Sequence, residues 1–224
     1  MSGVRVLLVD DHRMFAQALE MLLGGEDDIE VVGVLGSASE ALEVASREQP
    51  DVALVDIELP DMSGIEATLR LKEISPHTQV VAVTAHLGEE TVAGIVEAGA
   101  SGFIAKTQAA EVLVSTIRRA AAGEMVLPSA NFPAVLVGLR QAHRGRSDAR
   151  LALAQLTGRE IEILQKLAEG RSTQEVAKAL FISPLTVHSH VKNILAKLGV
   201  RSKLEAVTMG LRYGLIAIER AWAG

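Results

Sequence analysis

The chain has 224 residues, 49% of them hydrophobic, which is enough apolar material for one large or two small domains, and its lack of cysteine excludes disulfides and thiolate chemistry. It shows neither the apolar run of a signal peptide nor a stretch long enough to cross a membrane, so we expect a soluble, cytoplasmic protein with no membrane partner. Residues 1–124 hold 8 basic and 21 acidic residues, net −13, whereas residues 125–224 hold 14 and 7, net +7. The acidic half suits a metal or a signalling surface and the basic half suits nucleic acid, although a solvated surface can also be basic.

The first half alternates between short β-branched runs and helix-like stretches. The predicted strands are Val4–Val9, Ile29–Val34, Val52–Val55, Val80–Val83 and Gly102–Ala105. The predicted helices are Met14–Leu23, Ala38–Arg47, Gly64–Ile74, Glu89–Ala98 and Ala109–Ala122. Five strands that alternate with five helices predict a doubly wound α/β domain with a five-stranded parallel sheet.

Polar residues follow the apolar runs of this half. Asp10 and Asp11 end the first strand, Asp56 the third, Thr84 the fourth and Lys106 the fifth. In such a sheet the ligand site forms beyond the carboxyl ends of the strands, and carboxylates that converge there repel one another unless a cation lies among them. With oxygen ligands and no histidine or cysteine nearby, we expect Mg²⁺ first and Mn²⁺ second. Asp56 is then a third ligand and a nucleophile toward a phosphoryl group, whose oxygens Thr84 and Lys106 could bind.

The second half carries the signals of four short helices. The pattern S/T-x-x-E, which predicts a capping box, starts at Thr157, Ser172 and Ser202, and Ser183 precedes a proline suited to the first helical position. The predicted helices are 158–169, 174–180, 184–198 and 203–213. Only "FIS" links the second to the third, which indicates a small all-α helix-turn-helix domain, although such turns often contain glycine and this one does not.

The third of these helices has two different faces. The apolar side chains at Val187, Val191, Ile194, Leu195 and Leu198 form a stripe that must face the core. Roughly opposite lies a stripe formed by Leu185, His188, Ser189 and Lys192. A buried stripe with hydrogen-bond donors opposite suits contact with the major groove of DNA, whereas a plain solvated face is the alternative.

The motifs "VDD", "DIELPDMSG", "VTAH" and "GFIAK" give residues 1–122 a resemblance to the CheY-like receiver domains of two-component signalling. The resemblance implies that Asp56 is the phosphoacceptor for a sensor histidine kinase. It also implies that Asp11, Asp56 and the backbone carbonyl of Glu58 bind Mg²⁺ with help from Asp10, and that Phe103 is a switch aromatic beside Thr84 and Lys106. Thr107 follows the lysine where many family members have a cis proline.

Residues 154–217, with "LTGREIEILQKLAEG" and "TQEVAKALFISPLTVHSHVKNILAKLGV", resemble the LuxR-type helix-turn-helix. Together the halves are similar to the NarL/FixJ response regulators, with 123–153 as a linker. The resemblance implies that His188, Ser189 and Lys192 contact bases of double-stranded DNA at a two-fold site. It further implies that the active protein is a homodimer and that helix 203–213 contributes to the dimer.

Two other functions fit parts of the pattern. A Mg²⁺-dependent phosphohydrolase also places an aspartyl nucleophile after a strand, but it would need a substrate cap that the chain lacks. A DNA-binding adaptor that is not phosphorylated would not need the complete polar set at the strand ends. We therefore expect a phosphorylation-dependent transcription regulator and not an enzyme. The opposite charges of the halves further predict that the receiver docks on the basic face of helix 184–198 that would contact DNA, and hides this face from DNA.

Overall fold

The apolar runs of the first half form the sheet that they predict. In the computed structural model, which describes residues 3–85, 88–126 and 151–217, five parallel strands are arranged in the order β2-β1-β3-β4-β5. The strands are β1 (Val4–Val9), β2 (Ile29–Leu35), β3 (Val52–Asp56), β4 (Gln79–Thr84) and β5 (Gly102–Ala105). The helices between and after them are α1 (Arg13–Leu23), α2 (Ala38–Glu48), α3 (Gly64–Ile74), α4 (Glu89–Glu97) and α5 (Ala110–Ala121). The predicted fold class is thereby confirmed.

Helices cover both faces of the sheet because the strands are apolar on both faces. Leu8 and Leu54 point into one core layer together with Ile117 of α5, whereas Leu7 and Val55 point into the other with residues of α2 and α3. β3 is buried along its whole length, as expected for the central strand of a parallel sheet covered on both sides. This burial holds the carboxyl ends of the strands in a fixed arrangement.

In the described part of the second half, which resumes at 151, residues 151–153 are helical and four complete helices follow. They are α8 (Gly158–Ala168), α9 (Thr173–Leu180), α10 (Pro184–Leu198) and α11 (Lys203–Arg212). The capping boxes at Thr157 and Ser172 are present in full. At Ser202 only half of the predicted box forms, because the Glu205 carboxylate accepts a hydrogen bond from the amide of Arg201, 2.8 Å away.

The turn between α9 and α10 contains no glycine, and a bulky residue adopts the left-handed conformation in its place. Phe181 itself adopts the left-handed conformation, with φ 54°, and caps α9. Only a few per cent of residues other than glycine have positive φ, so this turn carries a local conformational cost. Ser183 then caps α10 by accepting a hydrogen bond from the Thr186 amide at 3.0 Å.

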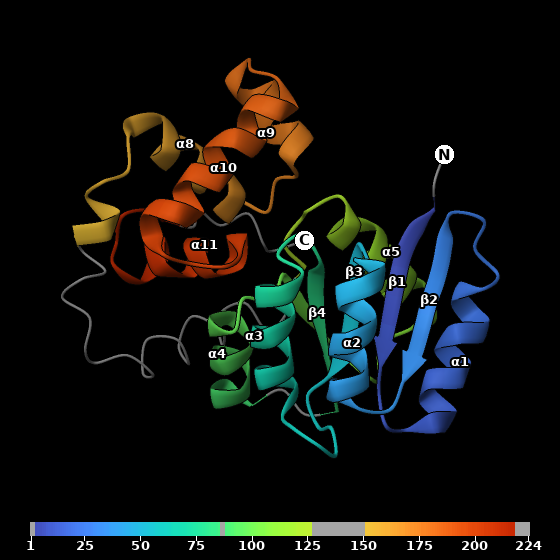
Figure 1. Cartoon of the computed structure of the whole chain (residues 1–224). Helices are drawn as coiled ribbons and strands as arrows, with labels where there is room; N and C mark the ends of the chain where they lie inside the picture. The colour runs from blue at the N-terminus through green and yellow to red at the C-terminus, as the bar shows by residue number, and fades with distance from the viewer. Residues whose placement is uncertain (1–2, 86–87, 127–150, 218–224) are drawn as a thin grey trace.

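The two domains are in contact, and the contact is made by α4 and α11 (Figure 1). One hydrophobic cluster runs from Val92 and Val96 of α4 to Leu204 and Val207 of α11. A β-carbon at Gly99, where φ is +94°, would lie 2.7 Å from the β-carbon of Arg201, so only glycine fits there.

The segment after α5 stays on the receiver for a few residues beyond the predicted boundary at 122. Val126 is buried and pairs with Gly102 of β5. Of the rest of the predicted linker, residues 127–150 lie outside the described residues, and residues 151–153 are helical rather than an exposed linker. None of the described helices combines the length and apolar content needed to span a membrane.

Candidate functional site

Strand register brings the predicted polar residues of the receiver together. Val9 pairs with Val55, which places Asp10 next to Asp56 at the ends of adjacent strands. Thr84 pairs with Ala105, and the amide of Lys106 donates to the Thr84 carbonyl at 2.8 Å. The sequence separates these residues widely, but the parallel sheet places all of them at one edge.

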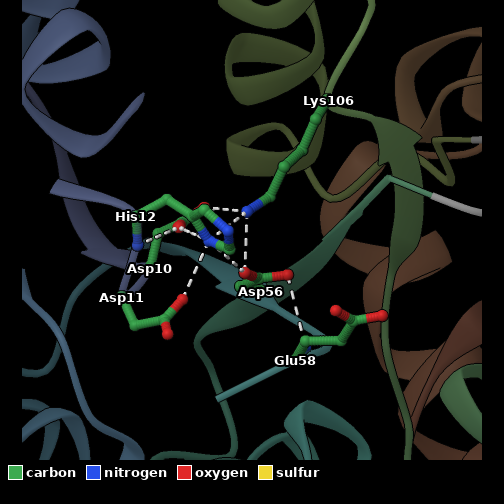
Figure 2. Close-up of polar contacts among 6 residues, drawn as sticks. All are labelled: Asp10, Asp11, His12, Asp56, Glu58 and Lys106. Carbon is green, nitrogen blue, oxygen red and sulfur yellow. Dashed lines mark hydrogen bonds and ion pairs between the residues drawn. The ribbon is translucent and has the colours of Figure 1, made fainter. Parts of the chain in front are cut away.

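Lys106 joins two buried carboxylates at this edge. Its Nζ lies 2.7 Å from Asp56 Oδ2 and 2.7 Å from Asp10 Oδ2, and the two aspartate side chains are 3% and 6% exposed (Figure 2). The described peptide bonds are all trans, so Lys106 reaches both partners with Thr107 in place of the family's proline. The ring of Phe15 lies 5.1 Å from the same ammonium, close enough for a cation–π interaction.

Burial and pairing act in opposite directions on these groups. Burial raises the pKa of Asp56, with a further contribution from the charge of Asp10, and the Lys106 ammonium only partly offsets this. Burial also works to lower the pKa of Lys106, but hydrogen bonds to Asp10 and Asp56 outweigh it and the pKa is raised. The lysine therefore stays cationic, and it balances the negative charge of the Asp56 carboxylate only in part.

His12 is a member of the site that the sequence analysis missed. Its Nδ1 lies 2.9 Å from Asp11 Oδ1, 3.2 Å from Asp10 Oδ1 and 3.6 Å from Asp56 Oδ2 (Figure 2). The expectation that no histidine lies nearby is therefore wrong. The "DDH" order was a usable clue, because the residue after a strand end is placed by the same turn as the carboxylates before it.

The donor set fits a divalent cation. Asp10, Asp11, His12 and Asp56 each offer a ligand atom, and these atoms lie within 4.8 Å of one another. Three carboxylates face one ammonium, so negative charge remains for a hard cation to balance. The amide of Glu58 donates to Asp56 Oδ1 at 3.3 Å, which places the Glu58 backbone beside the cluster while its side chain leads away (Figure 2).

Thr84 lies at the edge of the sheet and Phe103 lies two residues before the end of β5, and both are buried. Thr84, at the end of β4, is 4% exposed. Phe103 of β5 is fully buried, and it belongs to the hydrophobic cluster that also contains α4 and the C-terminal helices. The aromatic side chain thus connects the edge of the sheet with the contact between the domains.

The predicted DNA-contacting residues lie on one exposed surface of α10. His188, Ser189 and Lys192 are exposed, whereas Val187 and Ile194 on the opposite side are buried. Ser189 Oγ donates to the Leu185 carbonyl at 3.1 Å and keeps its lone pairs free to accept. We call the exposed face formed by Leu185, His188, Ser189 and Lys192 the recognition face.

The receiver does not dock on the recognition face. The contact runs through α11, which has no exposed residue and packs against α4 as well as α8 and α10. Lys203 Nζ donates to the Gly123 carbonyl at 2.6 Å and to Thr173 Oγ1 at 3.1 Å, and burial lowers its pKa. The expectation that the acidic half hides the recognition face is therefore wrong, because apolar packing and backbone hydrogen bonds determine the docking surface rather than net charge.

Comparison with known sequences identifies both domains. The family "Response regulator receiver domain" matches residues 6–118, and the family "Bacterial regulatory proteins, luxR family" matches residues 154–210. The fold and the acidic edge of the sheet are thus those of a receiver, and the C-terminal helices are those of a luxR-type DNA-binding domain. The chain belongs to the two-component response regulators that combine these two domains.

Several relatives align with this chain over both of its domains. The response regulator VraR of Staphylococcus aureus is 37% identical over 95% of this chain and 99% of its own. The uncharacterized transcriptional regulatory protein YhcZ of Bacillus subtilis is 35% identical over 95% and 97%. Among solved structures, the response regulator ChrA of a heme-sensing two-component system is similar over 96% of this chain and 100% of its own, with 31% identity and a TM-score of 0.51.

Proposed function

We propose that Asp56 accepts a phosphoryl group from the phosphohistidine of a sensor histidine kinase and that this switches DNA binding by α10. The observation that carries the proposal is the buried Asp56 carboxylate, 2.7 Å from Lys106 Nζ, in a chain that also presents an exposed recognition face. An Asp56 oxygen would attack phosphorus as the P–N bond breaks, and the leaving imidazole nitrogen would keep the electron pair.

The side chains around Asp56 suit this transfer. Asp10, Asp11, Asp56 and the Glu58 carbonyl would hold Mg²⁺, which when bound neutralises charge on the phosphoryl oxygens. Lys106 would exchange one carboxylate partner for a phosphoryl oxygen, and the Thr84 hydroxyl would donate to another. His12 lies against the same carboxylates and would have to turn aside for the incoming group.

The switch would act through the contact between α4 and α11. Phe103 shares a hydrophobic cluster with both α4 and the C-terminal helices, so a rearrangement at the sheet edge that moves Phe103 would change the packing at this contact. α11 has no exposed residue in this arrangement. We infer that phosphorylation loosens α11 from α4 and makes it available to a second copy, so that a homodimer binds a two-fold site in double-stranded DNA.

Acetyl phosphate can test the proposal on the full-length protein. With Mg²⁺ the wild type should gain one acid-labile phosphoryl group, become a dimer by light scattering and bind a selected duplex more tightly at one fixed salt concentration. Asp56→Asn should show none of the three changes. Asp27→Asn, at an exposed aspartate remote from the site, is the matched control and should behave as the wild type. Labelling of Asp56→Asn, or equal DNA affinity with and without the phosphoryl group, would contradict the proposal.

A further inference from the structure

Two large apolar side chains at the start of α10 are exposed to solvent. Phe181, in the turn, is 95% exposed, and Leu185, the second residue of the helix, is 75% exposed. Val187, Val191, Ile194 and Leu198 of the same helix are buried, as is usual for large apolar side chains. In the free protein the apolar area of Leu185 lies in water, so burying it against a partner would contribute favourable free energy to binding.

Leu185 lies on the recognition face itself. It precedes Ser189 by four residues and Lys192 by seven, so all three share one side of the helix. The serine hydroxyl donates to the Leu185 carbonyl at 3.1 Å, which ties the two residues together. Residues near the N-terminus of a recognition helix are those that reach base edges in the major groove.

The surroundings of Leu185 favour DNA over an apolar protein surface. α10 contains lysines and histidines but no acidic residue. Lys192 is exposed and forms no ion pair with any described residue. Lys178, also exposed, lines a groove with Phe181 and Pro184 at the α9 side of the turn. Cations on both sides of an apolar group complement a surface of phosphates around an apolar base substituent.

Only one base presents such a substituent in the major groove. Thymine carries a C5-methyl group there, and the other base edges offer hydrogen-bond donors and acceptors that leucine cannot use. We propose that Leu185 is a specificity-determining residue that contacts the C5-methyl group of a thymine in each half-site. The inference rests on the proposed DNA-binding function and names one of the bases that the protein would recognise.

Deoxyuridine provides a direct test, because it differs from thymidine only in lacking the C5-methyl group of the base. A site is first selected from a random duplex library with the full-length protein phosphorylated by acetyl phosphate and Mg²⁺, and each thymine is then replaced in turn and measured with the same phosphorylated protein. We expect one thymine in each half-site at which the wild type loses affinity about fourfold, the effect of removing one methyl group from a contact. Leu185→Ala should bind the thymine and deoxyuridine duplexes equally at that position.

Leu151→Ala is the matched control, since it makes the same substitution at a leucine that is 68% exposed in the same half of the chain, outside α10. It should keep the fourfold preference. Wild-type binding that is indifferent to deoxyuridine at every thymine would overturn the inference without help from any variant. So would an unchanged preference in Leu185→Ala, because a residue other than Leu185 would then contact the methyl group. Failure to enrich any sequence would overturn the proposed DNA-binding function as well, so the two failures are distinguishable.

Discussion

In the receiver, the functional side chains come from the ends of four strands and meet at one edge of the sheet around the buried Asp10 and Asp56, whereas on α10 they come from one helix and face solvent. Asp10 and Lys106 are 2.7 Å apart although many residues separate them along the chain. Ser189 and Lys192 are neighbours on the surface because they are neighbours in sequence. The first site depends on the whole domain, and the second depends on the geometry of a single helix.

The difference extends to the energetics of charge. A buried charge must be paired to be tolerated, while an exposed charge interacts weakly until a partner arrives. Three lysines cover this range: Lys106 is 14% exposed and lies between carboxylates, Lys72 is buried and donates to backbone carbonyls, and Lys192 is exposed. Removing each of them should therefore have a different consequence, and the sizes of the effects test the comparison.

Loss of Lys106 should have the largest effect. Lys106→Ala leaves the carboxylates of Asp10 and Asp56 together without their cation, so in EDTA the receiver should lose roughly 3 kcal/mol of stability. Hydrogen exchange of the amides of β1 and β3 measures this domain separately. Adding Asp56→Asn should restore part of the loss by removing one of the two charges. Exchange unchanged within about 0.5 kcal/mol would show that the pair contributes no more than a surface ion pair.

Lys72 should produce a smaller effect that depends on pH. Burial lowers the pKa of Lys72 to about 8, and among the described residues its ammonium donates to the carbonyls of Pro76 and Thr78, at 2.8 and 2.9 Å. Above the folded pKa and below the ordinary value of 10.5, the unfolded chain binds the extra proton, so stability rises with pH.

The measurement for Lys72 is urea unfolding at a series of pH values, compared with Lys72→Met. The wild type should gain roughly 1 to 2 kcal/mol relative to the variant between about pH 8 and about pH 9.5. Other groups that titrate in this range cancel in the difference. Parallel curves for the two proteins would show that Lys72 has its ordinary pKa.

The exposed lysine should have the smallest effect on folding and an effect only on DNA. Lys192→Ala should leave stability within about 0.5 kcal/mol. If Lys192 holds a phosphate rather than a base, the substitution should weaken binding to all sequences alike and reduce the slope of log affinity against log salt by about one. Lys166→Ala, at a lysine paired with Glu169 at 2.9 Å, should leave the slope unchanged. By contrast, His188→Ala or Ser189→Ala should change the preferred bases, and an unchanged binding logo in both would place the recognition face elsewhere.

The parts of the receiver site that were predicted are those that strand order determines. Asp10, Asp11, Asp56, Thr84 and Lys106 each follow an apolar run, and parallel strands bring such ends to one edge. His12 was missed although the "DDH" order places it directly after the two carboxylates, because a histidine after a strand end does not by itself indicate a contact with them. The contact distances show it beside three carboxylates, and this depends on how the turn after β1 folds back.

The sequence alone determined the elements, their order and the two domain types, because hydrophobic period, helix caps and strand ends are local features that act within a few residues. It also predicted which side of α10 is exposed, since one helix has one buried stripe. Only the tertiary structure decided which surfaces of the two domains meet. Net charge favoured the recognition face as the surface that contacts the receiver. In the structure α11 makes this contact instead, through the close approach of Arg201 to Gly99, the Lys203 hydrogen bond to Gly123 and the shared apolar cluster. Charge attraction acts over the Debye length without selecting a surface, whereas apolar packing requires shapes that fit and exist only after both domains have folded.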